Sequence, residues 1–392
     1  MTQLNVWLVF GTRPEAIKML PIVKLLQLDE RFNPIVCITA QHREMLDSVM
    51  KVFSVEADID LDAMTPGQNL ITLSSKLIEG LGKVLESPPS NIPQADYVLV
   101  HGDTATTFAG ALASYYNQVS VCHVEAGLRT NDIYGPFPEE GNRKLTSALT
   151  ELHFAPTHLA EGNLLKEGVS SDDIEVVGNT VIDALLWMRK EINNDKSLAG
   201  NMQGFVANLK NKYRRYVLIT CHRRESHGEA LERICSAIKT LSEKYQDTAF
   251  VFPVHPNPKT KGPVEKLLGG IQNIKLIDPL DYAPFIYVMD NCDLVLTDSG
   301  GVQEEAPSLN KPVLVLRDVT ERQEALLAGT VVLVGTDRDK IINTVVAFTE
   351  NEELYSGMSS AINPYGDGTT SIKIIDALYR HHQRKISSKE IL

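Results

Sequence analysis

The 392-residue chain lacks several features that would each place it in a particular class of protein. No segment approaches the run of about twenty apolar residues that a membrane-spanning helix needs, so we predict no membrane association. The net charge of −12 leaves little basic surface for a phosphate backbone, so we expect no nucleic-acid partner. The ten histidines form no HExxH or other metal-ligand spacing, which argues against a catalytic metal. GxGxxG is also absent, so a tightly held nicotinamide cofactor loses support and we predict no cofactor.

The cysteines and the start of the chain both predict a cytoplasmic protein. The five cysteines form no CxxC pair and lie mostly inside apolar runs, as buried thiols do in a reducing compartment. Met1 leads directly into a short apolar run, Leu4–Phe10, with no basic leader and no cleavage site. We interpret that run as a first β-strand and not as a signal peptide.

Short apolar runs alternate with longer amphipathic segments along the chain, and this pattern predicts the fold class. The predicted strands are Leu4–Phe10, Pro34–Thr39, Tyr97–His101, Val119–Val124, Tyr216–Thr220, Thr248–Pro253, Ile274–Ile277, Leu294–Thr297, Val313–Val315 and Val331–Val334. The predicted helices include Ala16–Leu28, Asn69–Leu85, Thr104–Tyr116, Val181–Ile192 and Ala230–Lys244. Because the strands are apolar throughout, we expect an α/β protein with doubly wound parallel sheets covered by helices on both faces.

The length of the chain predicts two domains, because one ordinary core does not extend over so many residues. The alternation pauses around 177–212, where a helix-like stretch leads into a polar segment rich in Asn and Lys. We therefore place the junction just before Val177. This gives an N-terminal domain over 1–176 and a C-terminal domain over 177–365, facing each other across a cleft.

The first candidate site follows the first predicted strand. Gly11 permits a tight turn at the carboxyl end of that strand, where open α/β sheets bind ligands, and Pro14 suits the first turn of a helix. Arg13 and Lys18 then lie near a helix N-terminus, where they can bind phosphate. The same spacing also fits a structural turn with two surface cations.

The second candidate site is the segment Thr297–Glu305, where an apolar strand again ends in small residues that open a helix. Ser299 and the backbone N–H groups of Gly300 and Gly301 can bind a diphosphate. Glu305, about one turn later, can accept hydrogen bonds from both ribose hydroxyls. The alternative is a helix N-cap with glycines for close packing. We favour the ligand site because two consecutive glycines weaken a helix start that has no ligand to approach.

Three carboxylates form the third candidate site. Asp103 and Glu125 each follow an apolar strand, so both can project over the same sheet edge, and Glu139 lies in the polar segment Pro138–Arg143. Carboxylates gathered at one edge are the kind of cluster in which environments separate acid and base roles. Alternatively, Asp103 is only the N-cap of the following helix and Glu125 only the ion-pair partner of Arg129.

The fourth candidate site is Cys221–Ser226, directly after the apolar run that opens the second predicted sheet. His222 and the two arginines that follow it can meet phosphates from the far wall of the cleft, and a solvated charge cluster is the alternative. We do not expect Cys221 and His222 to form a nucleophilic pair, because neighbouring residues at a strand end point to opposite faces.

At these four motifs the sequence resembles the non-hydrolysing UDP-N-acetylglucosamine 2-epimerase family. The resemblance covers almost the whole chain and also runs through Ala40–Leu46, Gly178–Trp187 and Asn363–Gly368. It implies the GT-B fold, with two Rossmann-like domains and a C-terminal helix over 366–392 that packs back onto the first. It also implies a homodimer that uses no metal and no nucleotide cofactor beyond its substrate.

The resemblance also implies roles for individual residues. The positions implicated in chemistry are Asp103, Glu125, Glu139 and His222, and those that bind substrate or UDP are Arg13, Lys18, Arg143, Ser299, Gly300, Gly301 and Glu305. Some bacterial members are activated by UDP-N-acetylglucosamine in a neighbouring pocket, and the corresponding segments here contain Gln41, Gln68, Glu140, Arg223 and His255. Glu44 stands where activated members can carry glutamine, and Cys221 where another small residue is usual.

The implied reaction is the reversible C2 epimerisation of UDP-N-acetylglucosamine to UDP-N-acetylmannosamine, a precursor for cell-envelope polysaccharide. The C2 proton is not acidic and oxidation would need a nicotinamide, so we expect elimination of UDP to 2-acetamidoglucal and re-addition. The alternatives are a GT-B glycosyltransferase with a UDP-sugar donor, a hydrolysing relative and a non-catalytic UDP-sugar sensor. The clustered acids favour an enzyme over a sensor, and exchange of a carbon-bound proton distinguishes the epimerase from a transferase.

Overall fold

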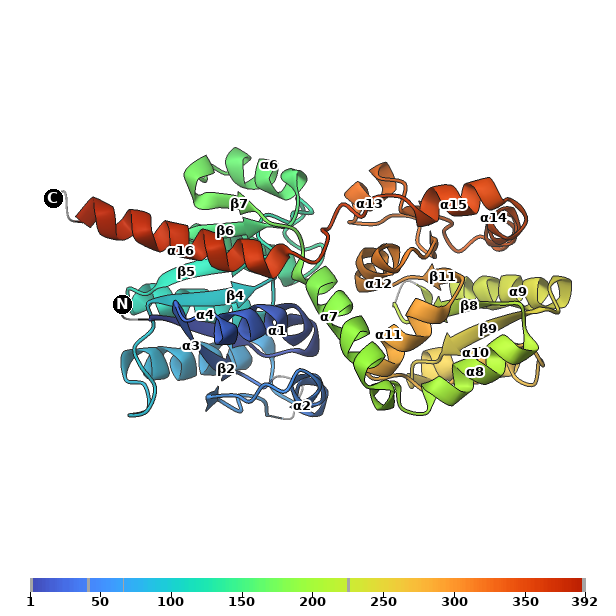
Figure 1. The fold of residues 1–392 in the computed structure, drawn as a ribbon, viewed down its shortest axis with the longest axis horizontal. Coiled ribbons are helices and arrows are strands. Elements are labelled where there is room, and N and C mark those ends of the chain that lie inside the picture. Colours follow the sequence, from blue (N-terminus) through green and yellow to red (C-terminus); the bar gives the residue numbers. More distant parts are fainter. Residues whose placement is uncertain (1–2, 41–42, 66, 224–225, 390–392) are drawn as a thin grey trace. The chain divides into compact units, whose positions relative to one another are not determined.

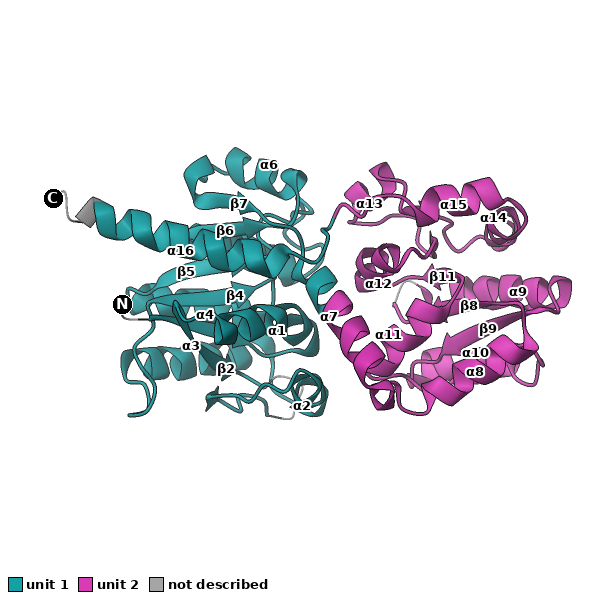
Figure 2. Ribbon diagram, in the orientation of Figure 1, with its two compact units in different colours: residues 1–184, 365–392 teal, residues 185–364 magenta. Residues whose placement is uncertain are grey.

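The computed structural model describes residues 3–40, 43–65, 67–223 and 226–389, and the chain divides into two compact units (Figure 2). Unit 1 comprises Met1–Ala184 and Tyr365–Leu392, and unit 2 comprises Leu185–Pro364. The chain leaves unit 1 within helix α7 (Thr180–Asn194) and returns shortly before α16 (Thr370–Lys389). The junction placed before Val177 from the sequence lies in the loop that precedes α7.

Unit 1 contains a seven-stranded, fully parallel sheet with the order β3-β2-β1-β4-β5-β6-β7 (Figure 1). Its strands are β1 (Leu4–Phe10), β2 (Phe32–Ile38), β3 (Ile59–Asp60), β4 (Tyr97–His101), β5 (Ser120–Val124), β6 (Leu152–Ala155) and β7 (Ile174–Val176). The strand order reverses between β1 and β4, and such a switch point leaves a crevice outside the carboxyl ends of the strands.

Helices cover both faces of this sheet, which explains why every residue of β4 is buried. The helices α1 (Arg13–Leu28) and α2 (Arg43–Val52) pack together on one side, where α16 also contacts α1. On the other side α3 (Leu70–Glu86), α4 (Ala105–Tyr116) and α5 (Glu139–Leu149) pack in sequence. Between the sheet and these helices, a hydrophobic core joins Trp7 and Val9 of β1 to Leu77 of α3 and Ala109 of α4. The remaining helix α6 (His158–Lys166) contacts β6 and β7.

Unit 2 repeats this construction with a six-stranded parallel sheet in the order β10-β9-β8-β11-β12-β13. Its strands are β8 (Arg215–Thr220), β9 (Thr248–Pro253), β10 (Ile274–Ile277), β11 (Leu294–Thr297), β12 (Val313–Val315) and β13 (Val331–Leu333). Its helices are α8 (Met202–Lys212), α9 (Glu229–Lys244), α10 (Pro258–Leu268), α11 (Tyr282–Asn291), α12 (Gly300–Glu305), α13 (Gln323–Leu327), α14 (Arg338–Glu350) and α15 (Glu352–Ser359). The switch point here lies between β8 and β11.

The predicted fold class is confirmed: both sheets are parallel and doubly wound, as in the two Rossmann-like domains of a GT-B fold. Ten of the observed strands were predicted to within two residues at each end, whereas β3, β6 and β7 were not predicted. Each of these short strands contains a polar residue (Asp60, His153 or Glu175), so none forms a continuous apolar run. In the part of the chain that the structure describes, no helix combines the length and apolarity needed to cross a bilayer.

Candidate active site

The four predicted sites follow strands near the two switch points. Most of these strands flank a switch point directly, and β5, which precedes Glu125, is the neighbour of β4. In unit 1, the turn at Gly11 and the start of α1 with Arg13 and Lys18 follow β1, and Asp103 follows β4, the neighbour of β1 in the sheet. In unit 2, His222 follows β8 and Ser299 follows the adjacent strand β11. Each unit therefore presents its polar motifs where open α/β sheets bind ligands.

Glu15 connects the two loops at the switch point of unit 1. Its Oε2 accepts hydrogen bonds from the backbone N–H groups of Gly11 (3.1 Å) and Thr12 (2.8 Å), and Oε1 accepts one from the Thr104 hydroxyl (2.7 Å). Burial raises the pKa of this carboxyl. Glu15 was not predicted as a site residue, although the Thr-x-x-Glu spacing of a capping box marks it in the sequence.

The β1–α1 turn is also sterically tight. A Cβ atom at Gly11 would lie 2.0 Å from Oγ1 of Thr39, so only glycine fits there. Arg13 is the first residue of α1 and is half-buried. The turn thus carries Arg13 at the N-terminus of the helix, where the helix dipole favours an anion.

Glu125 follows β5 and forms a nearly buried ion pair with Lys18. Nζ of Lys18 lies 2.5 Å from Oε1 of Glu125, and the two side chains are 12% and 10% exposed. Asn179 donates a hydrogen bond from Nδ2 to the same oxygen at 2.9 Å. Arg129, the alternative partner considered from the sequence, is paired with Glu167 at 2.7 Å. The structure therefore brings together Lys18 and Glu125, which are 107 residues apart.

Asp103 follows β4, which lies between β1 and β5 in the sheet, and pairs with Arg143. Nη2 and Nε of Arg143 lie 2.7 and 2.9 Å from Oδ2 of Asp103. The alternative role of Asp103 as the N-cap of α4 is wrong, because the hydroxyl of Thr104 accepts the capping hydrogen bond from the Thr107 N–H. The carboxylate of Asp103 is thus directed at a cation and not at the helix start.

Glu140 is occupied by contacts within unit 1. Its buried carboxylate accepts hydrogen bonds from the backbone N–H groups of Thr130 and Asn131, both at 3.1 Å, and from Nη1 of Arg143 at 2.9 Å. Burial opposes ionisation, but these donors lower the pKa of Glu140 below its usual value. Its observed role is to hold the 130–131 turn against the arginine that binds Asp103.

Glu139, the first residue of α5, differs from these paired carboxylates. Its Oε2 is buried and accepts no hydrogen bond from any residue that the structure describes. The helix position also places it one turn before Arg143. Within unit 1, this oxygen is therefore well suited to accept a proton from a ligand.

In unit 2, the fully buried Asp298 organises the loop that carries His222. Its Oδ2 accepts hydrogen bonds from the backbone N–H groups of His222 (2.9 Å) and Arg223 (2.8 Å) and from the hydroxyl of Ser226 (2.8 Å). Asp298 lies inside a motif recognised from the sequence, but no local signal showed that it would bind the loop after β8.

The imidazole of His222 remains partly exposed beside that of His255. The two rings are stacked with centroids 6.3 Å apart, so a residue predicted to be catalytic and one predicted to be regulatory are neighbours. Partial burial lowers the pKa of His222, and Asp298 opposes this shift. Burial also raises the pKa of the Cys221 thiol, which is therefore protonated and a poor nucleophile at neutral pH.

The two glycines after β11 have different surroundings. A Cβ atom at Gly300 would lie 3.2 Å from the guanidinium carbon of Arg322, and Nη2 of Arg322 lies 2.8 Å from Oε1 of Glu304. Gly300 therefore has a structural reason for being glycine. The first side-chain atom near a Cβ at Gly301 is Oε2 of Glu305 at 3.9 Å, so the backbone there is more open. Arg322 was not predicted as a site residue from the sequence.

Glu305 is buried at the end of α12, and the hydroxyl of Tyr282 lies 3.3 Å from its Oε1. Ser299 is the N-cap residue of α12, and its side chain makes no capping hydrogen bond within the described part of the helix. Both side chains are thus placed around one short helix, as the sequence predicted.

Of the residues predicted to be regulatory, Gln41 lies outside the described residues. Gln68 is in an exposed turn before α3, where its Oε1 accepts a hydrogen bond from Thr65 (2.8 Å). Arg223 is fixed through its backbone to Asp298. Glu44 is exposed in the first turn of α2.

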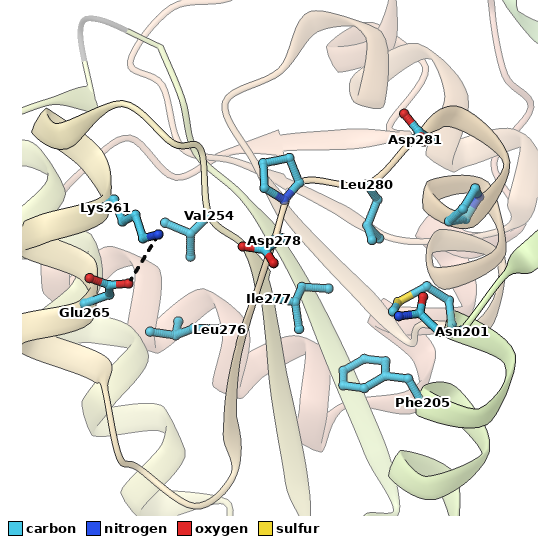
Figure 3. Close-up of a pocket in the computed structure, with 13 residues that line it drawn as sticks. Asn201, Phe205, Val254, Lys261, Glu265, Leu276, Ile277, Asp278, Leu280 and Asp281 are labelled. Carbon is cyan, nitrogen blue, oxygen red and sulfur yellow. Dashed lines mark ion pairs between the residues drawn. The ribbon is translucent and has the colours of Figure 1, made fainter. Parts of the chain in front are cut away.

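A separate cavity of about 590 Å³ lies beside the edge strand β10 of unit 2 (Figure 3). Lys261 and Glu265 of α10 line one side, and Asn201 and Phe205 line the other. None of the described residues that line this cavity was predicted as a site residue. It is therefore distinct from the motifs described above.

The chain matches known proteins over nearly its full length. The family model described as UDP-N-acetylglucosamine 2-epimerase matches residues 24–379. A UDP-N-acetylglucosamine 2-epimerase of Yersinia pestis is 51% identical over 96% of this chain and 99% of its own. One of Escherichia coli K12 is 50% identical over 96% of this chain and 98% of its own.

Solved structures also align with the chain over nearly its full length. The UDP-GlcNAc 2-epimerase of Neisseria meningitidis, bound to UDP-GlcNAc, is 47% identical, has a TM-score of 0.87 and aligns over 96% of this chain and 100% of its own. A Staphylococcus aureus protein solved with UDP is 45% identical, has a TM-score of 0.85 and aligns over 97% of both chains.

Proposed function

Because the chain belongs to the UDP-N-acetylglucosamine 2-epimerase family, we propose that it interconverts UDP-N-acetylglucosamine and UDP-N-acetylmannosamine by elimination and re-addition of UDP. The observation that carries the proposal is the group of carboxylates at the carboxyl edge of the first sheet. Asp103 follows β4, Glu125 follows β5 and Glu139 begins α5. A protein that only senses a UDP-sugar has no need of three acids in this place.

In the proposed mechanism, unit 2 binds UDP. Ser299 and the N–H groups of Gly300 and Gly301 bind the diphosphate, and Glu305 accepts hydrogen bonds from the ribose hydroxyls. His222, whose backbone N–H is bound by Asp298, donates to a phosphate oxygen. These donors stabilise the charge that develops on the leaving UDP, which is usually the largest contribution to such catalysis. A relative from S. aureus has been solved with UDP, which supports UDP as the ligand.

Unit 1 acts on the sugar. A carboxylate removes the C2 proton, the C2–H electrons form the C1=C2 bond and the C1–O bond to UDP breaks, which gives 2-acetamidoglucal and UDP. Re-addition of UDP to C1, with protonation of C2 on the opposite face, completes the epimerisation. We assign the proton abstraction from the gluco epimer to Glu139, whose Oε2 has no hydrogen-bond partner among the described residues. Oδ2 of Asp103 is instead occupied by the guanidinium of Arg143.

The cations of unit 1 complete the proposal. Lys18 stabilises the Glu125 carboxylate, and Arg143 fixes the direction of Asp103. Arg13, at the N-terminus of α1, contributes positive charge toward the diphosphate. Acid and base roles then differ among the three carboxylates because their partners differ.

The test is proton NMR of the purified protein with UDP-N-acetylglucosamine alone in heavy water. We expect a mixture of the two epimers, with deuterium at C2 of both. Quantitative release of free sugar would indicate a hydrolysing enzyme. Absence of any reaction until an acceptor is added would indicate a glycosyltransferase, and either result would reject the proposal.

We also propose that the enzyme is a cytoplasmic homodimer that UDP-N-acetylglucosamine activates at a second site. Five buried free cysteines support the reducing compartment. Gln41, Gln68, Arg223 and His255 are the proposed regulatory residues, whereas the buried contacts of Glu140 favour a structural role for it. Light scattering tests the dimer. A sigmoidal dependence of rate on UDP-N-acetylglucosamine, lost in Gln68→Ala, tests the activation.

A further inference from the structure

The carboxylate of Glu125 is contacted by side chains from three segments that lie far apart in the sequence. Lys18 of α1 and Asn179, which precedes α7, donate to Oε1 at 2.5 and 2.9 Å. His101, the last residue of β4, places Nε2 3.3 Å from Oε2. All of these groups are largely buried, with Lys18 the most exposed at 12%. The two carboxylate oxygens therefore face different partners.

The amide of Asn179 has a fixed orientation. Its Oδ1 accepts a hydrogen bond from the Val181 N–H at 3.0 Å, so Nδ2 is the end that faces Glu125. Its backbone N–H donates to the carbonyl of Tyr365 at 2.7 Å. Asn179 and Tyr365 lie on the two segments by which the chain leaves and re-enters unit 1. The Glu125 carboxylate is thus connected through Asn179 to both segments.

His101 has one N–H to donate. Burial lowers the pKa of His101 to about 4, so the ring is neutral at pH 7 and carries a single proton. The tautomer with that proton on Nε2 can donate to Oε2 of Glu125. In the described structure neither ring nitrogen completes a well-aligned hydrogen bond. Catalytic hydrogen bonds are often long without substrate and shorten in the Michaelis complex.

We infer that His101 and Asn179 are positioning residues that hold the Glu125 carboxylate in its working orientation during the chemical step. The inference rests on the proposed function, because it takes Glu125 to act on the sugar. Lys18 supplies the charge that stabilises the anion. The two neutral donors, His101 and Asn179, orient the carboxylate. Misplacing a reacting group by about 1 Å can cost on the order of 10²-fold in rate.

Two substitutions of His101 distinguish the hydrogen bond that it donates to Glu125 from the space that its ring fills. Glutamine places its amide nitrogen near the position of Nε2, whereas asparagine places it near Nδ1, so only glutamine can donate to Oε2. We expect His101→Gln to retain most of the wild-type kcat. His101→Asn and Asn179→Ala should each lower kcat by about 10–10²-fold with KM nearly unchanged, because the contact matters in the transition state.

The measurements are steady-state kinetics and deuterium uptake at C2, with UDP affinity from calorimetry as the control for unit 2. In a Glu125→Gln background, His101→Asn should cost little more, since the two residues act as one unit. His153→Gln is a matched control, because His153 is a buried histidine of β6 whose electrostatic neighbours are His123, Arg129 and Glu167 and not Glu125. That variant should change stability and leave kcat near the wild-type value.

The outcomes distinguish this inference from the proposed function. Normal turnover in Glu125→Gln would reject the role of Glu125 itself. A large loss in Glu125→Gln with normal turnover in His101→Asn and Asn179→Ala would reject only the positioning role. Equal losses in His101→Gln and His101→Asn, or full additivity with Glu125→Gln, would show that the ring only fills space. Should His101→Asn fail to fold, Asn179→Ala and its cycle with Glu125→Gln decide the question.

Discussion

Oδ1 of Asp298 lies 3.3 Å from Nδ1 of His222, while Oδ2 of the same carboxylate accepts hydrogen bonds from the backbone of His222 and Arg223. One buried side chain at the end of β11 thus fixes the backbone of a histidine at the end of β8 and places a carboxylate oxygen beside its ring. Because β8 and β11 flank the switch point of unit 2, this contact places His222 at the proposed phosphate site.

We expect Asp298→Asn to weaken UDP binding by about tenfold or more. The amide cannot accept all the hydrogen bonds that the carboxylate accepts, and hydrogen bonds to a charged group are each worth roughly 1.5–3 kcal/mol. Calorimetry with UDP measures the change. Ser226→Ala, which removes a single donor to Asp298, serves as the control and should have a smaller effect. An unchanged Kd in Asp298→Asn would show that the loop does not depend on this contact.

The three carboxylates should affect the chemical step far more than UDP binding. Asp103→Asn, Glu125→Gln and Glu139→Gln should each lower kcat and kcat/KM together by about 10²–10⁴-fold, the usual contribution of general acid–base catalysis. A variant that still incorporates deuterium at C2 but cannot turn over has lost the group that serves the second face. Near-normal turnover in all three would place the base elsewhere.

The substitution Glu305→Ala should reduce UDP affinity by tenfold or more, because it removes a bidentate contact to the ribose while the fold survives. Tyr282→Phe is the matched control, since it removes only the hydroxyl that lies 3.3 Å from Oε1 of Glu305. We expect a smaller loss in the control. Calorimetry showing the same affinity in Glu305→Ala as in the wild type would leave Glu305 a structural residue of α12.

The buried histidines of unit 1 predict acid sensitivity. Burial lowers the pKa of His101 and His123 to about 4 and that of His153 to about 3, whereas an unfolded histidine titrates near 6.5. As the pH falls below about 6.5, the unfolded chain takes up protons that the folded chain does not, so the free energy of unfolding falls. Each histidine contributes about 1.4 kcal/mol per pH unit in this window.

Urea denaturation at pH 7 and pH 5 checks this prediction. His153→Gln should show a smaller loss of unfolding free energy between the two pH values than the wild type, because one titrating group is removed. Equal losses in both proteins would mean that His153 does not contribute to the acid sensitivity.

The positions of the functional motifs could be predicted from the sequence. Strands such as β1 and β4 are continuous apolar runs, and each is followed directly by polar residues and glycine, so the strand ends and the residues that follow them are local features. The parallel, doubly wound construction follows from the same pattern. The strands β6 and β7 were not recognised because His153 and Glu175 interrupt their apolar residues, although they complete the first sheet.

The partners of the functional residues could not be predicted in the same way. Lys18 and Glu125 are 107 residues apart, and Asp298 contacts His222 across 76 residues. Local sequence sets backbone conformation and periodicity, whereas these contacts depend on the order of the strands in each sheet. The sequence by itself determined which residues stand at the strand ends. Only the tertiary structure decided which of them meet, because packing places β1 beside β4 and β8 beside β11 and so selects the partner of each charge.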